Sequence, residues 1–203
     1  GYGRDVVEID LLKRVEVLKG PSSALYGSDG LAGAVAYTTK DPSDYLDGKQ
    51  IHVSSGARHD SSSDRNKFSI LAAGAYGDIE AMVQVVDHSL SERNLHDDVT
   101  MSANGLDGEQ ESLFTKLKYN LNDSISFTLT ADEQNWSGDW NLATDVGMSF
   151  FPAIVNTSSS LGQDRGFRDR YSLDIDLEIN SIFSERASVK FYSQTTEQSQ
   201  MTT

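Results

Sequence analysis

The sequence predicts a mainly β fold, in which most strands form one antiparallel meander of the kind found in transmembrane β-barrels. Three observations lead to this class. From Lys49 onward, apolar and polar residues alternate in seven successive segments, the pattern of strands with one apolar face. Short turns and long polar loops follow one another in alternation, as in a membrane-spanning barrel. No run approaches the roughly 20 apolar residues that a membrane-spanning helix needs.

Two short apolar runs precede this meander. Val15–Leu18 and Ala34–Thr39 have the length and the branched residues of strands. The glycines and Pro21 between them predict turns and one short helical turn. Residues 1–13 fit either a strand or a short helix that leads into Arg14. The beginning of the chain therefore predicts a small α+β unit with a glycine-rich centre.

Each of the seven later segments sets an apolar face against a strongly polar one. A polar face of this kind suits a water-filled or protein-filled lumen, and it equally suits the solvent face of a soluble sheet. Pairing of the last two segments places Glu178 opposite Arg186 and Asp174 opposite Lys190, and each exposed pair favours that register by a few tenths to about 1 kcal/mol. The segments span residues 51–58, 68–76, 80–85, 113–121, 125–132, 171–179 and 187–192.

The connections are predicted to alternate between the two ends of the strands. Tight turns are expected at Gly77-Asp78, at Asn122-Asp123 and at residues 180–184. Long loops rich in Gly, Ser, Asn and Asp are expected at residues 90–109 and 137–168, and the brief gap at 61–65 falls on their side. This arrangement is typical of barrels with tight periplasmic turns and extended extracellular loops.

Three sequence blocks occur in order near the start: RVEVLKGP from Arg14, ALYGSD from Ala24, and GAV from Gly33 followed by TKDP from Thr39. Together they resemble the end of the plug domain of TonB-dependent outer-membrane receptors. The tail Thr39–Leu46 further resembles the subgroup that takes haem from haemoglobin. The positions that carry the plug resemblance are Arg14, Glu16, Gly20, Pro21, Leu25, Tyr26, Gly27, Gly30 and Gly33.

The resemblance implies a domain division, with the C-terminal part of a plug at residues 1–47 and the first barrel strands at 48–203. A plugged transporter has about 22 strands, so we expect the chain to be a fragment of a longer receptor. It further implies close packing of the glycine-rich segment 27–33 between the plug and the barrel wall. This role for the segment is a hypothesis.

The same resemblance implies active uptake across the outer membrane, without catalysis. The expected cargo is haem or haemoglobin-derived iron, and the alternatives are a ferric siderophore or vitamin B12. The expected partners are the TonB energy-transducing complex, the cargo and outer-membrane lipid. A different class also fits the strand pattern: a soluble secreted β-domain that binds carbohydrate or protein, or more remotely a hydrolase.

Composition limits the other functions. The chain has 17 basic and 31 acidic residues, and this net charge of -14 argues against nucleic-acid binding. It has no cysteine, so thiolate metal sites and a cysteine nucleophile are excluded. No intrinsic cofactor, metal site or catalytic residue is predicted. His88 and His96 flank the start of a predicted extracellular loop and are weak candidates for ligating haem iron, although each also fits an ordinary surface histidine.

Four aromatic residues cluster at the end of the fifth segment and in the loop after it: Trp136, Trp140, Phe150 and Phe151. Amphipathic rings accumulate at membrane interfaces, so we expect an interfacial girdle or packing within the loop. A stacking surface for a planar ligand is the alternative.

Overall fold

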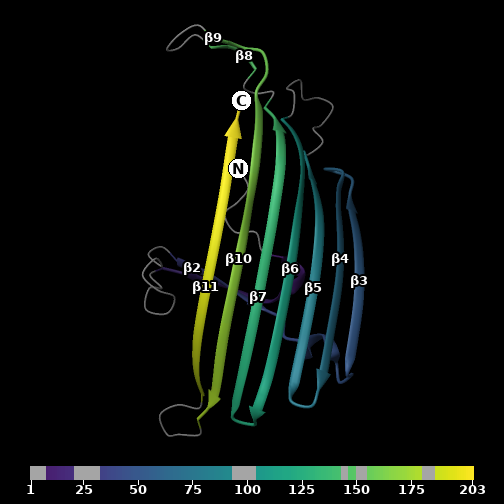
Figure 1. Cartoon of the computed structure of the whole chain (residues 1–203), viewed down its shortest axis with the longest axis vertical. Coiled ribbons are helices and arrows are strands. Elements are labelled where there is room, and N and C mark those ends of the chain that lie inside the picture. Colours follow the sequence, from purple (N-terminus) through teal and green to yellow (C-terminus); the bar gives the residue numbers. More distant parts are fainter. Residues whose placement is uncertain (1–7, 21–32, 93–103, 143–145, 150–154, 180–185) are drawn as a thin grey trace.

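The computed structural model describes residues 8–20, 33–92, 104–142, 146–149, 155–179 and 186–203. Seven long strands form one antiparallel sheet in the order β11-β10-β7-β6-β5-β4-β3, which confirms the predicted mainly β class (Figure 1). In the described part of the chain, no helix has the length and hydropathy to cross a membrane. The strands are β3 (Ile51–Asp60), β4 (Arg65–Tyr76), β5 (Ile79–Ser91), β6 (Gly105–Asn122), β7 (Ile125–Asn141), β10 (Leu161–Glu178) and β11 (Arg186–Thr202).

Consecutive strands of the sheet are neighbours, as a meander requires. Gly77-Asp78 joins β4 to β5, and a similarly tight turn at 123–124 joins β6 to β7. Between β7 and β10 the chain forms a small hairpin of β8 (Gly147–Ser149) and β9 (Val155–Thr157) beyond the end of the sheet (Figure 1). The predicted turn at residues 180–184 lies outside the described residues.

The strands on the long-loop side are longer than predicted. The predicted loops 90–109 and 137–168 were wrong in extent, because β5 continues to Ser91, β6 begins at Gly105, β7 continues to Asn141 and β10 begins at Leu161. Backbone ladders extend both pairs of strands through residues rich in Ser, Asp, Gln and Gly. Such segments lack the alternation of apolar and polar residues from which strands are predicted, although their backbones pair equally well.

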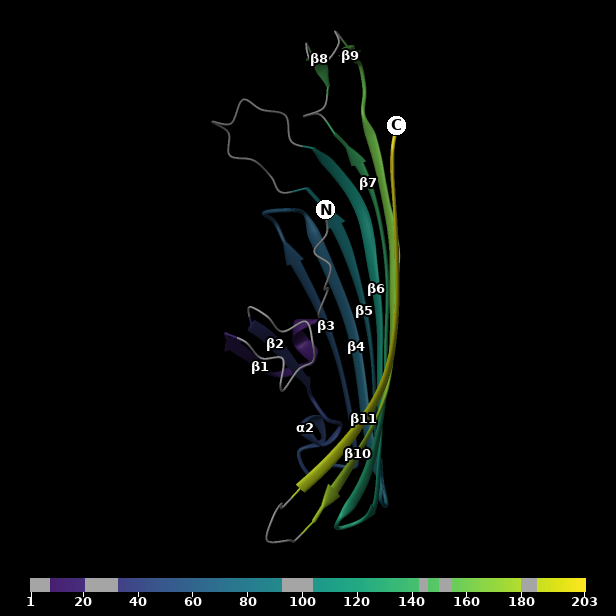
Figure 2. The ribbon, with the colours of Figure 1, turned by 90° about the vertical axis from the view of Figure 1, so that its left-hand side faces the viewer.

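Before the sheet comes a smaller unit, which we call the N-terminal unit (residues 8–20 and 33–47). It contains the 3-10 helix η1 (Ile9–Leu11), the antiparallel pair β1 (Leu12–Lys19) and β2 (Gly33–Thr39), and the short helix α2 (Ser43–Leu46). Both predicted apolar runs are therefore strands. Of the open choice at residues 1–13, the described residues 8–13 contain η1 and the start of β1, and residues 1–7 lie outside the described residues. Figure 2 shows the N-terminal unit on the concave side of the curved sheet.

The two faces of the sheet differ as the alternation predicted. Apolar side chains on the convex face are exposed, among them Phe68, Val85 and Leu129. The concave face carries the buried polar side chains, including Gln84, Ser112 and Asp132. Because an apolar exposed face is stable only against an apolar medium, this division suits strands that contact lipid on one side.

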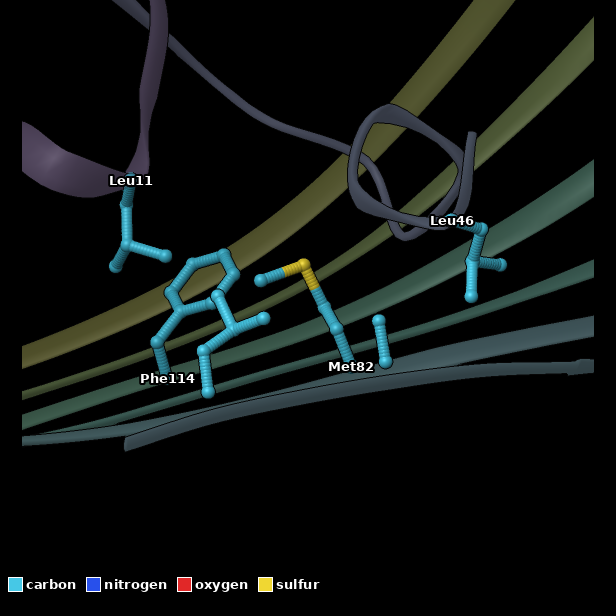
Figure 3. Close-up of a cluster of buried hydrophobic side chains, with 6 residues drawn as sticks. Leu11, Leu46, Met82 and Phe114 are labelled. Carbon is cyan, nitrogen blue, oxygen red and sulfur yellow. The ribbon is translucent and has the colours of Figure 1, made fainter. Parts of the chain in front are cut away.

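Buried apolar side chains also occur on the concave face, which the alternation predicted to be strongly polar. Leu11 and Leu46 reach from the N-terminal unit toward Met82 and Phe114 of the sheet (Figure 3). The cluster is completed by Leu71 and Ala73. Fully burying each large side chain stabilises the contact by about 1.5–3 kcal/mol, so these residues hold the N-terminal unit against β4, β5 and β6.

The predicted charge pairs between the last two strands are present. Arg186 lies 3.7 Å from Glu178, and Lys190 lies 2.9 Å from Asp174. In both pairs the residues are directly opposite in the β10–β11 register.

Candidate functional site on the concave face

The plug-like motif is only partly covered by the structure. Arg14 and Glu16 lie on β1, where Arg14 Nε is 3.1 Å from the Glu16 carboxylate. Gly20 follows β1 directly and has a positive φ of 103°, the conformation that glycine tolerates best. The other members of the motif, Pro21, Leu25, Tyr26, Gly27 and Gly30, lie outside the described residues.

Gly33 opens β2 opposite the end of β1. A Cβ at this position would lie 2.5 Å from the carbonyl oxygen of Leu18, and φ is 151°. The close approach is therefore between the two strands of the N-terminal unit. The expected packing of segment 27–33 against the barrel wall stays a prediction, because residues 27–32 lie outside the described residues.

Lys116 of β6 makes the most complete polar contact between the sheet and the N-terminal unit. The side chain is buried, and its Nζ donates to Thr39 Oγ1 at 2.9 Å, to the Lys40 carbonyl at 2.8 Å and to Asp41 Oδ1 at 3.0 Å. An ammonium group has three protons, so these acceptors satisfy it fully. The contact fastens the segment after β2 to the centre of the sheet.

A second polar contact centres on the buried carboxylate of Glu8. Glu8 caps η1, where it accepts from the Asp10 amide at 3.5 Å. Its carboxylate also pairs with Lys67 of β4 and lies 3.0 Å from His88 Nε2 of β5. Burial by itself raises the pKa of Glu8, but the hydrogen bonds from His88 and Lys67 more than offset it and lower this pKa to about 2. Glu8 is therefore ionised at neutral pH.

His88, a predicted candidate for haem ligation, is occupied by this contact. The imidazole is largely buried between the sheet and η1, with Nε2 against the Glu8 carboxylate. In this arrangement the nitrogen is not presented to a ligand. His96, the other candidate, lies outside the described residues.

Within the N-terminal unit, an ion pair joins β1 to α2. Lys13 Nζ lies 2.8 Å from Asp44 Oδ1. Burial raises the pKa of Asp44, but the bonds from Lys13 and from the Asp41 amide outweigh burial and lower it. The hydrogen bond to Asp44 in turn raises the pKa of Lys13. The pair ties the short helix, which contributes Leu46 to the apolar cluster, to the strand beside it.

Nearer the long-loop end, β7 and β10 carry a different polar cluster. Asp132 Oδ2 accepts from Arg168 at 3.1 Å and from Arg170 at 3.0 Å, while Gln134 donates to Asp132 Oδ1 at 3.3 Å. Two guanidinium groups therefore share one carboxylate. The Arg168 Nε and the Gln134 Oε1 are buried and have no hydrogen-bond partner among the described residues.

Trp136 and Trp140 also face the concave side, so the expected interfacial girdle was wrong for them. The strand alternation places them with the buried Asp132 and Gln134 rather than with the exposed Leu129. Trp140 Nε1 donates to Asp164 Oδ2 at 3.1 Å. The remaining aromatic candidates, Phe150 and Phe151, lie outside the described residues.

Comparison with known proteins agrees with this arrangement of a small unit inside a curved sheet. Residues 1–34 match the family model described as the TonB-dependent Receptor Plug Domain. The chain is 32% identical over 147 residues to hemoglobin-binding protein A of Haemophilus influenzae, covering 65% of this chain and 14% of that protein. The chain belongs to the TonB-dependent receptors. Residues 1–34, which include η1, β1 and the start of β2, are accordingly plug sequence.

Other receptors of this kind are also similar. The hemoglobin and hemoglobin-haptoglobin-binding protein of Haemophilus ducreyi is 30% identical over 161 residues, which cover 70% of this chain and 17% of that protein. The hemin receptor of Yersinia pestis is 43% identical over 68 residues, 33% of this chain and 10% of that protein. The chain thus spans less than a fifth of the length of these receptors.

The sequence patterns missed several residues of this TonB-dependent receptor that join the N-terminal unit to the sheet. Lys116, Lys67 and Glu8 carry no motif, and their contacts bridge about 60 to 80 positions of the chain. The inward position of Trp136 was available from the alternation, because it shares parity with Ser126 and Thr128 on the polar face of the same strand.

Proposed function

We propose that this chain forms the end of the plug (residues 1–47) and the first seven wall strands (48–203) of an outer-membrane receptor that imports haem, taken from haemoglobin. The observation that carries the proposal is the similarity to haemoglobin-binding receptors, which covers 65% and 70% of the chain and is therefore not confined to the plug-like beginning. Cargo binds at the outer face, and the TonB complex of the inner membrane supplies the energy. No covalent chemistry is involved.

The contacts between plug and wall support a mechanism in which the plug rearranges while the wall stays folded. The wall is held by continuous backbone ladders from β3 to β11. The plug is held by a few side-chain contacts, chiefly those of Lys116 and Glu8 and the apolar cluster. Water entering the lumen replaces the polar partners at low cost, whereas breaking the ladder would leave backbone groups unpaired in lipid. Pulling on the plug therefore separates it before the wall opens.

The proposal is tested with the full-length receptor that contains this chain, purified in detergent micelles and titrated with hemin. A saturable shift of the Soret band at about one haem per chain supports haem as cargo. Uptake of hemin by cells that express the receptor is expected to stop when the TonB gene is deleted.

Two results would overturn parts of the proposal. A micelle-bound receptor with no Soret shift would exclude haem and direct the search to ferric siderophores. A full-length product that stays soluble and monomeric without detergent would exclude the membrane barrel.

A further inference from the structure

The arginine pair on β10 has more donors than its partner can accept. Asp132 supplies one negative charge to Arg168 and Arg170, so one positive charge remains on this part of the wall. The Arg168 side chain is only 7% exposed, whereas that of Arg170 is 43% exposed toward the lumen. The arrangement leaves Arg170 able to pair with a second carboxylate without losing Asp132.

Beside the arginines, toward the long-loop end, the inner face of the wall carries the side chains of Trp136 and Trp140. Trp136 lies against Gly166, where an added Cβ would be 2.4 Å from the indole ring, so only glycine fits beneath it. Glycines also occupy the inward positions 108 of β6, 138 of β7 and 162 of β10. A pocket of about 260 Å³ opens next to Trp140 and Gly162. Gly166 lets the Trp136 indole lie close against β10, and this partly exposed ring is the surface on which a planar ligand stacks.

The spacing along the strands links these two features. Trp136 pairs with Gly166, and the next two inward positions of β10 are Arg168 and Arg170. Inward positions are spaced by about 7 Å, so the arginines lie roughly 7 and 13 Å below the indole. Asp164, on the other side, is buried and accepts from Trp140. Its negative charge disfavours a ligand carboxylate there, so an anionic planar ligand is oriented with its acid groups at the arginines.

We propose that Trp136, Gly166, Arg168 and Arg170 form a binding site on the lumen wall for a planar aromatic ligand that bears carboxylates, such as a porphyrin dicarboxylate. The ring stacks on the Trp136 indole, and a carboxylate pairs with Arg170 in the charge-assisted geometry that guanidinium groups favour. The inference rests on the proposed haem transport and names where the cargo meets the wall. It needs no ligation of iron.

The test uses the full-length receptor in detergent micelles and iron-free protoporphyrin IX, which removes any contribution from axial ligands. Loss of one charge-assisted pair in Arg170→Gln is expected to weaken protoporphyrin binding about tenfold. The matched control is Arg165→Gln, which changes the same residue type on the opposite face of the same strand and is expected to bind as the wild type does. Protoporphyrin dimethyl ester, which has no carboxylate, is expected to bind the wild type and Arg170→Gln equally.

Three results would overturn the proposed binding site. Wild-type receptor that does not bind protoporphyrin IX excludes it, while hemin uptake in cells still decides the proposed transport separately. Equal weakening of the acid and the ester in Arg170→Gln means that the substitution only disturbs the wall. Unchanged porphyrin affinity in Arg170→Gln leaves Arg170 only its structural bond to Asp132 and excludes the binding site.

Discussion

Replacing Lys116 by methionine tests whether the plug is held at one point. Methionine keeps the apolar stem but removes the ammonium group, which makes three hydrogen bonds of 2.8 to 3.0 Å to Thr39, Lys40 and Asp41. Hydrogen bonds to a charged group contribute about 1.5–3 kcal/mol each, but the Asp41 side chain is 37% exposed and regains water. We therefore expect a total loss of about 3 kcal/mol, which makes plug release roughly 100-fold more favourable.

Hydrogen exchange in the full-length receptor measures this release. Helix α2 has only four residues, too few to persist when it leaves the wall, so its amides report docking. Exchange of the peptide covering residues 33–47 should accelerate by up to about 100-fold in Lys116→Met. The control is Lys190→Met, which breaks an ion pair of 2.9 Å whose lysine is 61% exposed and should leave exchange unchanged. Exchange within about twofold of the wild type in Lys116→Met would refute the reasoning.

Three further predictions concern the plug. The pKa of Glu8 is lowered from 4.5 to about 2, so its carboxylate contributes stability above pH 4.5 that is lost as the pH falls toward 2. Glu8→Gln should therefore remove this pH dependence from the thermal unfolding temperature. Gly33→Ala places a Cβ 2.5 Å from a β1 carbonyl and should lower the free energy of unfolding by more than Gly74→Ala, whose Cβ would lie 3.7 Å from the Gln50 carbonyl oxygen, an ordinary contact. Gly33→Trp should abolish hemin uptake while surface binding of hemin persists. Leu11→Ala should lower the free energy of unfolding, measured by chemical denaturation, by about 2–4 kcal/mol. The control Ile9→Ala lies on the same turn but is 77% exposed, and it should lower this free energy by less than about 0.5 kcal/mol. Equal losses in the two variants would contradict the role of the apolar cluster.

Local patterns predicted the wall well because its determinants are local. Alternation assigns each residue of a strand to one face, and a tight turn fixes the register with the next strand. The pairs of Glu178 with Arg186 and of Asp174 with Lys190 followed directly from those two rules. The same alternation, extended from Leu129, places Trp136 on the inner face, although a membrane-interface position was expected from its residue type.

The sequence by itself determined the β class, the two faces of the wall and the plug-like beginning, since each depends on residues close together in the chain. Only the tertiary structure decided which inner residues meet the plug. The pairing of Glu8 with His88 joins positions 80 residues apart, and it depends on how the N-terminal unit sits in the curve of the sheet. The apolar patch of Met82 and Phe114 among polar neighbours has the same origin, because an inner face is polar where it meets water and apolar where the plug excludes it.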